Sequence, residues 1–106
     1  MATLEDFKKL DLRVAEILEA QPHPDADRLY LLQIQVGEEK KQIVAGIRTA
    51  YEADGLKGKK IIVVNNLEPA VIRGQTSNGM LLAAKNDQTL SLVTIEKELP
   101  SGVRVG

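Results

Sequence analysis

The clearest pattern of hydrophobic and polar positions is an apolar stretch that passes into a regular alternation and ends at Val36. This stretch, Leu29–Val36, predicts a strand with one face buried and the other in water. A turn at Gly37–Glu39 and a second β-rich run at Gln42–Ile47 follow, so the two runs are expected to pair as a hairpin. Further on, Lys59–Asn66 centres on an unbroken β-branched run, which predicts a strand buried on both faces.

Shorter patterns fill the second half of the chain. Tyr51–Leu56 can form one helical turn, Gly74–Gly79 is a loop of small polar residues, and Met80–Ala84 and Leu90–Ile95 predict two more short strands. Several short strands with glycine-marked turns favour a barrel or a sandwich, and a chain of 106 residues suits one small barrel.

The N-terminal region is less clear. Thr3 is a suitable helix cap, so a short helix is expected over Leu4–Leu10. The next stretch, Asp11–Ala20, is ambiguous, because its Ala, Leu and Glu residues favour a helix while its brevity and the prolines after it permit a strand. Pro22 and Pro24 prevent regular structure from continuing.

Composition narrows the functional classes. The chain has no cysteine, which excludes a disulfide framework and thiol chemistry and makes the cytoplasm the expected compartment. Its only aromatic residues are Phe7, Tyr30 and Tyr51, so a generic single-strand binder that stacks bases on several aromatic side chains is disfavoured. The longest apolar run, Met80–Ala84, is far short of the roughly 20 residues of a membrane-spanning helix, and no secretory signal pattern opens the chain.

The charge pattern leaves two interpretations open. A net charge of −1 is unfavourable for nucleic-acid binding, which depends on Lys and Arg contacts to phosphate. Acidic residues dominate the stretch from Glu5 to Asp27, however, so a one-sided basic face is compatible with the sequence, as is an ordinary solvated surface. The basic residues gather at Lys40-Lys41, Arg48, Lys57, Lys59-Lys60, Arg73 and Lys85.

Catalytic and metal-binding patterns are missing. His23 is the only histidine, and with Asp25 and Asp27 beside it a turn with local hydrogen bonds is favoured over a metal site. No serine lies in a nucleophile motif, and neither a phosphate-binding glycine loop nor a dinucleotide-binding turn occurs. We therefore predict a domain without catalytic residues, metal or cofactor.

The segment Asn66–Met80 has the chemistry of a binding loop. The amides of Asn66 and Asn78 and the hydroxyl of Ser77 can donate to and accept from base edges or a 2′-hydroxyl, and Arg73 can form a forked contact with phosphate. The same residues also suit a polar turn between strands, and chemistry alone leaves both interpretations open.

A series of short motifs extends through nearly the whole chain in a fixed order. Together these motifs resemble the tRNA-binding domain family, which occurs at the C-terminus of many methionyl-tRNA synthetases, near the N-terminus of bacterial phenylalanyl-tRNA synthetase β subunits, and as stand-alone dimeric tRNA-binding proteins. The motifs are Asp6-Phe7, Asp11-Leu12-Arg13-Val14, His23-Pro24-Asp25-Ala26-Asp27-Arg28-Leu29, Ile43-Val44-Ala45-Gly46-Ile47, Leu56-Lys57-Gly58-Lys59, Val64-Asn65-Asn66-Leu67, Pro69 and Ser77-Asn78-Gly79-Met80-Leu81-Leu82-Ala83-Ala84.

The resemblance implies a mainly β fold, a five-stranded barrel of the oligonucleotide-binding type (OB-fold) with a short N-terminal helix and a C-terminal β extension. We expect one domain over residues 1–106, with the barrel at about 11–85 and the extension at about 89–106. Leu12–Ala20 then becomes the first barrel strand, since tertiary context can overrule local propensity.

The resemblance further implies that the domain grips the outer corner of the L-shaped tRNA, by shape and backbone. Arg28, where the family often has Lys, looks like an RNA contact, and Ser77 and Met80 match positions associated with tRNA binding. One departure makes this surface less basic, because Glu68, Ala70 and Val71 stand where the family commonly carries Lys or Arg. The expected tRNA-binding residues are Arg28, Arg73 and Lys85 on phosphate, Ser77, Asn78 and Met80 lining the groove, and Asn66 as a further contact.

From this we expect a tRNA-binding module, either a stand-alone homodimer or an appendage to the catalytic part of a methionyl-tRNA synthetase. Pairing two copies would raise affinity through effective concentration, and the apolar C-terminal run Leu90–Val105 is the expected partner interface. Two other functions stay open: an export-related, chaperone-like homodimer that binds unfolded peptide, and a structural docking domain of a synthetase.

Overall fold

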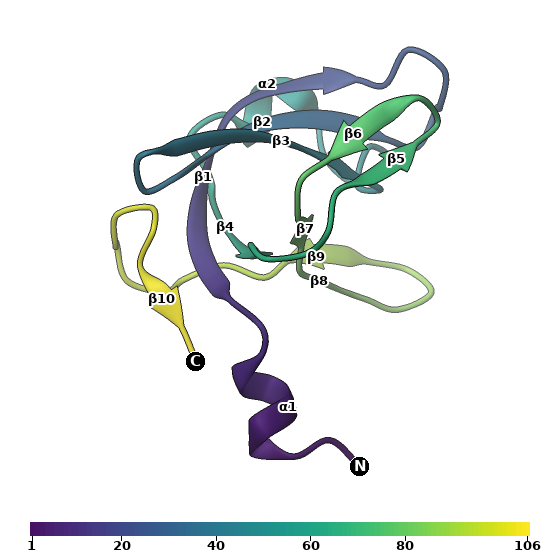
Figure 1. Cartoon of the computed structure of the whole chain (residues 1–106). Coiled ribbons are helices and arrows are strands. Elements are labelled where there is room, and N and C mark those ends of the chain that lie inside the picture. The colour runs from purple at the N-terminus through teal and green to yellow at the C-terminus, as the bar shows by residue number, and fades with distance from the viewer.

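A curled antiparallel sheet organises the chain. In the computed structural model, which describes all 106 residues, the strand order is β3-β2-β1-β4-β7, and β10 pairs with the start of β1 (Figure 1). The predicted mainly β fold with a short leading helix is confirmed. The strands of this sheet are β1 (Leu12–Pro22), β2 (Tyr30–Val36), β3 (Glu39–Ala45), β4 (Lys60–Val64), β7 (Met80–Leu81) and β10 (Arg104–Val105).

The long strand β1 makes the sheet curl. Its first half, Leu12–Glu16, pairs with β4, and its second half, from Glu16 to Pro22, pairs with β2. A register shift between Ile17 and Glu19 interrupts the pairing with β2, and such a bulge bends a strand and increases its twist. The stretch that was ambiguous in sequence is therefore a strand, as the family resemblance implied.

Two aliphatic clusters lie on opposite sides of the sheet. The larger one fills the inside of the curl, where Ile17, Leu32 and Ile61 are fully buried and Tyr30 is the one buried aromatic residue. The smaller one comprises Leu12, Val14, Ile62 and Val64 on the outer side of β1 and β4, covered by C-terminal residues that include Val103 and Val105. The prediction that the β-branched strand is buried on both faces is confirmed.

Short elements complete the fold. The helix α1 (Leu4–Lys8) projects from the barrel, with the predicted Thr3 cap in place, and α2 (Ala53–Leu56) inserts Leu56 into the core (Figure 1). Two hairpins branch from the sheet: β5 (Ala70–Ile72) with β6 (Gln75–Ser77), and β8 (Ala83–Lys85) with β9 (Leu90–Leu92).

Two predicted boundaries were wrong. The run Met80–Ala84 is divided between β7 and β8 at Leu82. The backbone N–H of Leu82 donates to the carbonyl of Ile62 in β4, whereas its carbonyl accepts from the N–H of Val93, so the run changes partner strands there. The predicted loop Gly74–Gly79 contains strand β6, whose three residues are too few to show an alternation. None of the helices has the length and apolar character that crossing a membrane requires.

Candidate nucleic-acid interface

The outer face of β2 and β3 is polar and lies between two long connections. Gln33 and Gln35 alternate with buried residues on β2 and stand opposite Gln42 and Lys40 on β3. Loop 23–29 joins β1 to β2, and segment 65–79 joins β4 to β7 and contains the β5–β6 hairpin. In barrels of this type the face of the second and third strands and the two equivalent loops hold oligonucleotides.

A buried histidine ties the two connections together. His23 is only 2% exposed; its Nδ1 accepts from the backbone N–H of Asp25 at 3.0 Å, so Nε2 carries the proton and donates to the carbonyl of Ile72 at 3.1 Å. Both ring nitrogens are thus used inside the protein. No three His, Asp or Glu side chains gather closely enough to hold a metal ion.

Arg73 occupies the tip of the β5–β6 hairpin in an unusual conformation. Its φ is +52°, and that of Gly74 is +85°, so both central positions of this two-residue turn are left-handed, as in a type I′ turn. Asn, Asp and Gly adopt this conformation more easily than Arg, and strained residues of this kind cluster at functional sites. The guanidinium also donates to the carbonyl of Asp25 at 2.7 Å.

The three basic residues predicted to contact phosphate lie along one side of the barrel. Arg28 and Arg73 line one open hollow of about 290 Å³, together with Asp25 and Asp27. Arg28 also lines a second hollow of about 470 Å³, between the 46–50 turn and the loop at Lys85. All three side chains are exposed. Because Arg28 shares one hollow with Arg73 and the other with Lys85, the three residues form a row with Arg28 in the middle.

Ser77 and Asn78 close the barrel at the free edge of β3. The hydroxyl of Ser77 accepts from the backbone N–H of Val44 and donates to the carbonyl of Gly79, both at 2.9 Å, and the residue is 4% exposed. The backbone N–H of Asn78 donates to the carbonyl of Gln42 at 2.8 Å. Ser77 therefore holds the loop in this structure, and its single proton is not available to donate to RNA.

Asn66 is also used inside the chain. Its Oδ1 accepts from the backbone N–H of Asp11 at 2.9 Å, and its Nδ2 donates to the carbonyl of Lys9 at 2.8 Å, which fixes the linker after α1. Asn66 was expected from the sequence to contact tRNA, but both the oxygen and the nitrogen of its amide are already bonded within the chain. Met80, by contrast, is 50% exposed on β7 and remains available.

A polar network runs from this linker to β3. Burial raises the pKa of Asp11, but hydrogen bonds from Arg13 and Asn65 and the positive charges of Arg13 and Arg104 hold that pKa below its usual value. Asn65 in turn accepts from Nζ of Lys41 at 2.8 Å through its side chain and at 3.2 Å through its carbonyl. The ammonium group of Lys41 is thereby fixed at the free edge of β3, on the opposite face of the strand from Gln42.

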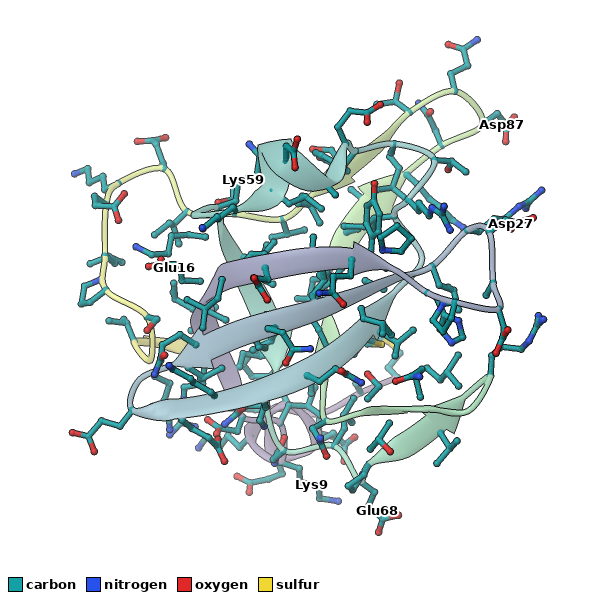
Figure 2. The ribbon with its side chains drawn as sticks, turned by 90° about the horizontal axis from the view of Figure 1, so that it is seen from above. Lys9, Glu16, Asp27, Lys59, Glu68 and Asp87 are labelled. Carbon is teal, nitrogen blue, oxygen red and sulfur yellow. The ribbon has the colours of Figure 1, made fainter.

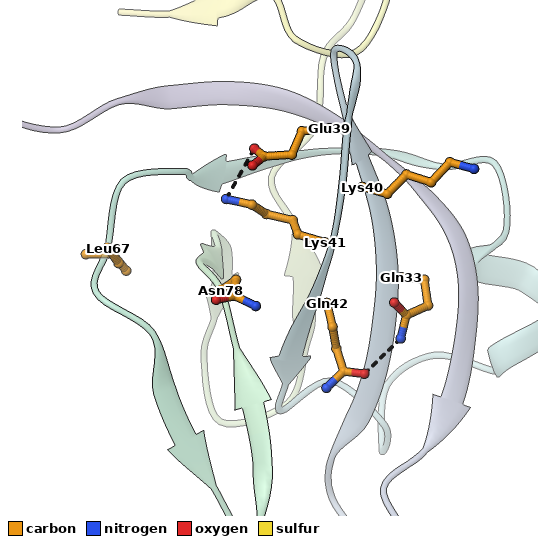
Figure 3. A pocket seen from close by; sticks show the side chains of 7 residues that line it. All are labelled: Gln33, Glu39, Lys40, Lys41, Gln42, Leu67 and Asn78. Carbon is orange, nitrogen blue, oxygen red and sulfur yellow. Dashed lines mark hydrogen bonds and ion pairs between the residues drawn. The ribbon is translucent and has the colours of Figure 1, made fainter.

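A third hollow, of about 580 Å³, lies where the polar face meets segment 65–79, and we call it the β3 hollow (Figure 3). Sequence reasoning missed most of its residues. The alternation marks Gln33 as solvent-facing, but only the pairing of Gln33 with Gln42 shows that the two amides meet. The β3 hollow is lined by Gln33, Glu39, Lys40, Lys41, Gln42, Leu67 and Asn78.

Acidic groups limit the direction of approach for a polyanion. Glu16 and Glu19 on β1 stand opposite Gln35 and Gln33, so the outer face becomes negative toward β1. Asp27 and Glu68 project outward from the two connections (Figure 2). Asp27 shares a hollow with Arg28 and Arg73, so a phosphate on that side meets positive and negative groups together, and its contacts must be with the guanidinium groups themselves.

Comparisons with known proteins identify the family to which the chain is related. A family model of tRNA binding domains matches residues 12–104. A methionine–tRNA ligase of Bacillus cereus is 47% identical over 103 residues, which cover 97% of this chain and 16% of the ligase, so the chain spans about a sixth of that relative's length.

Solved structures match over the full length. A methionyl-tRNA synthetase-related protein from Pyrococcus horikoshii has a TM-score of 0.92 at 31% identity, covering 100% of this chain and 98% of its own. The chaperone CsaA from Bacillus anthracis has a TM-score of 0.91 at 31% identity, covering 100% and 99%. With a family model that spans most of the chain, and relatives this similar, the chain belongs to the tRNA-binding domain family.

Proposed function

We propose that this chain binds structured tRNA along the row of Arg28, Arg73 and Lys85, with Asn78 and Met80 in the adjoining groove. The observation that carries the proposal is Arg73. A left-handed position in a type I′ turn favours Asn or Gly, yet the chain places there a guanidinium that faces the same hollow as Arg28. Recognition through phosphate contacts is by shape and backbone, with little discrimination among tRNAs.

Salt dependence tests the phosphate contacts. A gel shift with bulk tRNA weakens steeply as salt rises, and Arg28→Ala lowers affinity and reduces the slope of log K against log salt by about one unit. Lys59→Ala is the matched control, because it removes one exposed positive charge immediately before β4, away from both connections (Figure 2). Absence of any shift at low salt refutes the proposal, and equal effects of the two substitutions refute the assigned row.

We also propose that the chain forms a homodimer through α1 and the C-terminal extension. The five-residue helix has no buried residue, and Leu4 and Phe7 are 66% and 43% exposed. A helix this short is not stable without packing, which favours a second copy against it. A Cβ on Gly106 would lie 3.1 Å from the Phe7 ring, so the C-terminus adjoins the same apolar patch.

Sizing chromatography at micromolar concentration tests the dimer. Wild-type protein elutes at twice the mass of the chain, and Phe7→Asp elutes as a monomer with unchanged circular dichroism. Two linked tRNA sites also bind more tightly than one through effective concentration, so Phe7→Asp weakens tRNA binding without altering the row of basic residues. A wild-type monomer refutes this part of the proposal alone.

Within a longer, synthetase-like protein of the cytoplasm, this domain supplies tRNA binding and the catalytic part lies elsewhere in the chain or in a partner subunit. Support comes from the ligases that this chain matches over a sixth of their length. The test compares the KM for tRNA of two samples. The remainder of such a ligase fused to this domain has a lower KM than the same remainder mixed with the separate domain.

One observation favours a second function, binding of unfolded peptide. The structure matches a chaperone over its whole length, and Val71 and Met80 expose apolar side chains beside the groove, at 72% and 50%. Suppression of a client protein's aggregation that does not weaken with salt, and that Val71→Ser reduces, would establish this function. Failure to suppress aggregation at equimolar protein excludes it.

A further inference from the structure

The β3 hollow contains hydrogen-bonding groups that the fold leaves without partners. We propose that it holds one unpaired base of the bound RNA, and that the base it fits is guanine. This inference rests on the proposed tRNA binding. It adds one base-specific contact to the phosphate contacts proposed for Arg28, Arg73 and Lys85. The hollow is large enough for a base and its ribose, and it is open to solvent (Figure 3).

Lys41 supplies a fixed donor. Its side chain is only 12% exposed, and two of its three protons go to the carbonyl and the side-chain oxygen of Asn65. The third proton has no hydrogen-bond partner in the protein. Nζ therefore presents one N–H group to the hollow from a position that the bonds to Asn65 hold in place.

Glu39 supplies an acceptor next to this donor. Its carboxylate is 62% exposed and lies 3.8 Å from Nζ of Lys41, which is close enough for charge attraction but too far for a hydrogen bond. Both carboxylate oxygens are free to accept. A carboxylate near a bound polyanion opposes binding unless it pairs with donors on the nucleic acid. Pairing with such donors would therefore turn Glu39 from an unfavourable charge into a favourable contact.

Guanine matches this pair. Its Watson–Crick edge offers two adjacent N–H donors, at N1 and N2, beside the acceptor O6. A carboxylate can accept both N–H groups in the parallel geometry that it forms with Arg, while Nζ of Lys41 donates to O6. Adenine, cytosine and uracil each lack the two adjacent donors, so none of them can use both oxygens of Glu39 in this way.

The remaining contacts come from the side of β3 that carries Glu39 and Lys41. Gln33 and Gln42 lie across the edge of that strand, where Gln33 donates to Gln42 at 2.9 Å and Gln42 donates to the carbonyl of Thr76 at 2.9 Å, so they bound the hollow without contacting the base (Figure 3). The side-chain amide of Asn78 has no hydrogen-bond partner and is free for a ribose hydroxyl. Leu67, 40% exposed, offers an apolar surface to one face of the base.

The base must be unpaired, because a base pair would occupy the edge that Glu39 and Lys41 contact. Sequence-specific recognition of RNA uses such unpaired bases in loops and bulges. The contact thus selects a tRNA surface that displays an accessible guanine near the phosphates bound by Arg28, Arg73 and Lys85.

Kethoxal footprinting tests the inference, because kethoxal reacts with N1 and N2 of unpaired guanines. With a single tRNA transcript and saturating full-length protein, one unpaired guanine becomes at least fivefold less reactive, in keeping with the worth of one bidentate base contact. Glu39→Gln has one acceptor oxygen and abolishes this protection. Glu38→Gln is the control, since it removes the same charge from the adjacent exposed position, outside the hollow.

The outcomes separate this inference from the proposed function. If Glu39 were only a counter-ion of Lys41, both substitutions would raise tRNA affinity equally and leave the footprint unchanged, which would overturn the inference. A complex that forms without protecting any guanine also overturns the inference, but it leaves the proposed phosphate contacts of Arg28, Arg73 and Lys85 standing. If no complex forms at low salt, the proposed tRNA binding itself fails.

Discussion

Ser77→Ala separates a structural hydroxyl from an RNA contact. The hydroxyl joins segment 65–79 to the free edge of β3 through its bonds to Val44 and Gly79. The N–H of Val44 points away from β2, and its only acceptor is Ser77. Alanine removes this acceptor and leaves a buried donor without a partner, since Val44 is 9% exposed.

The magnitude follows from this one group. An unsatisfied buried donor costs about 1–3 kcal/mol, whereas the Gly79 carbonyl is half-buried and can take a water molecule instead. A loss of about 2 kcal/mol in the free energy of unfolding corresponds to a fall of roughly 8–16 °C in Tm for a domain of this size.

Thermal and urea unfolding measure the loss of stability, with Thr76→Ala as the control, because Thr76 is exposed and its hydroxyl has no hydrogen-bond partner. The tRNA gel shift is measured alongside. Affinity falls because Asn78 and Met80 are no longer held in place, yet the salt slope stays that of wild type, since Ser77 contacts no phosphate. Wild-type stability with a large loss of tRNA affinity would refute this reasoning and restore Ser77 as a direct contact.

Three further substitutions test other parts of the structure. Arg73→Asn suits the left-handed turn, so the free energy of unfolding stays within about 0.5 kcal/mol of wild type. The affinity for tRNA falls and the slope of log K against log salt loses about one unit, and unchanged tRNA binding would contradict the assigned phosphate contact of Arg73. Asp11 has a lowered pKa, so its stabilising contribution is present above about pH 4 and is lost as pH falls through the folded-state pKa. The free energies of unfolding of Asp11→Asn and wild type, measured in urea, therefore differ at pH 7 and the difference shrinks as the pH is lowered below about 4; a difference independent of pH contradicts the assignment. In Gly102→Ala, with φ at +95°, the new Cβ would lie 2.7 Å from the Cα of Gly37, so the free energy of unfolding falls by at least about 1–3 kcal/mol, whereas Gly55→Ala, with open space around it, is neutral or stabilising in the same assay.

The sequence alone predicted the strands whose patterns are long. Leu29–Val36 alternates over enough residues to show which face is buried, and the β-branched run in Lys59–Asn66 indicates burial on both faces, because these signals come from local periodicity. It also singled out Arg28 by family resemblance and Arg73 and Lys85 by their charge as phosphate contacts, which stay predictions, and the structure brings these three residues to neighbouring hollows. Absence of catalytic motifs was equally a matter of residue types, which need no fold to be read.

Only the tertiary structure decided which polar side chains are free. Ser77 and Asn66 have binding chemistry in sequence, yet the fold uses their hydrogen bonds to close the barrel and to fix the linker. Gln42 showed no signal in sequence and Lys41 stood out only as one of several basic residues, and both line the β3 hollow because strand register and the return of segment 65–79 bring them there. The physical reason is that a donor or acceptor is available to a ligand only when no partner within the chain takes it. Val44, which donates to Ser77, is 33 residues from it, and Asp11, which donates to Asn66, is 55 residues from it, so local sequence does not reveal these bonds.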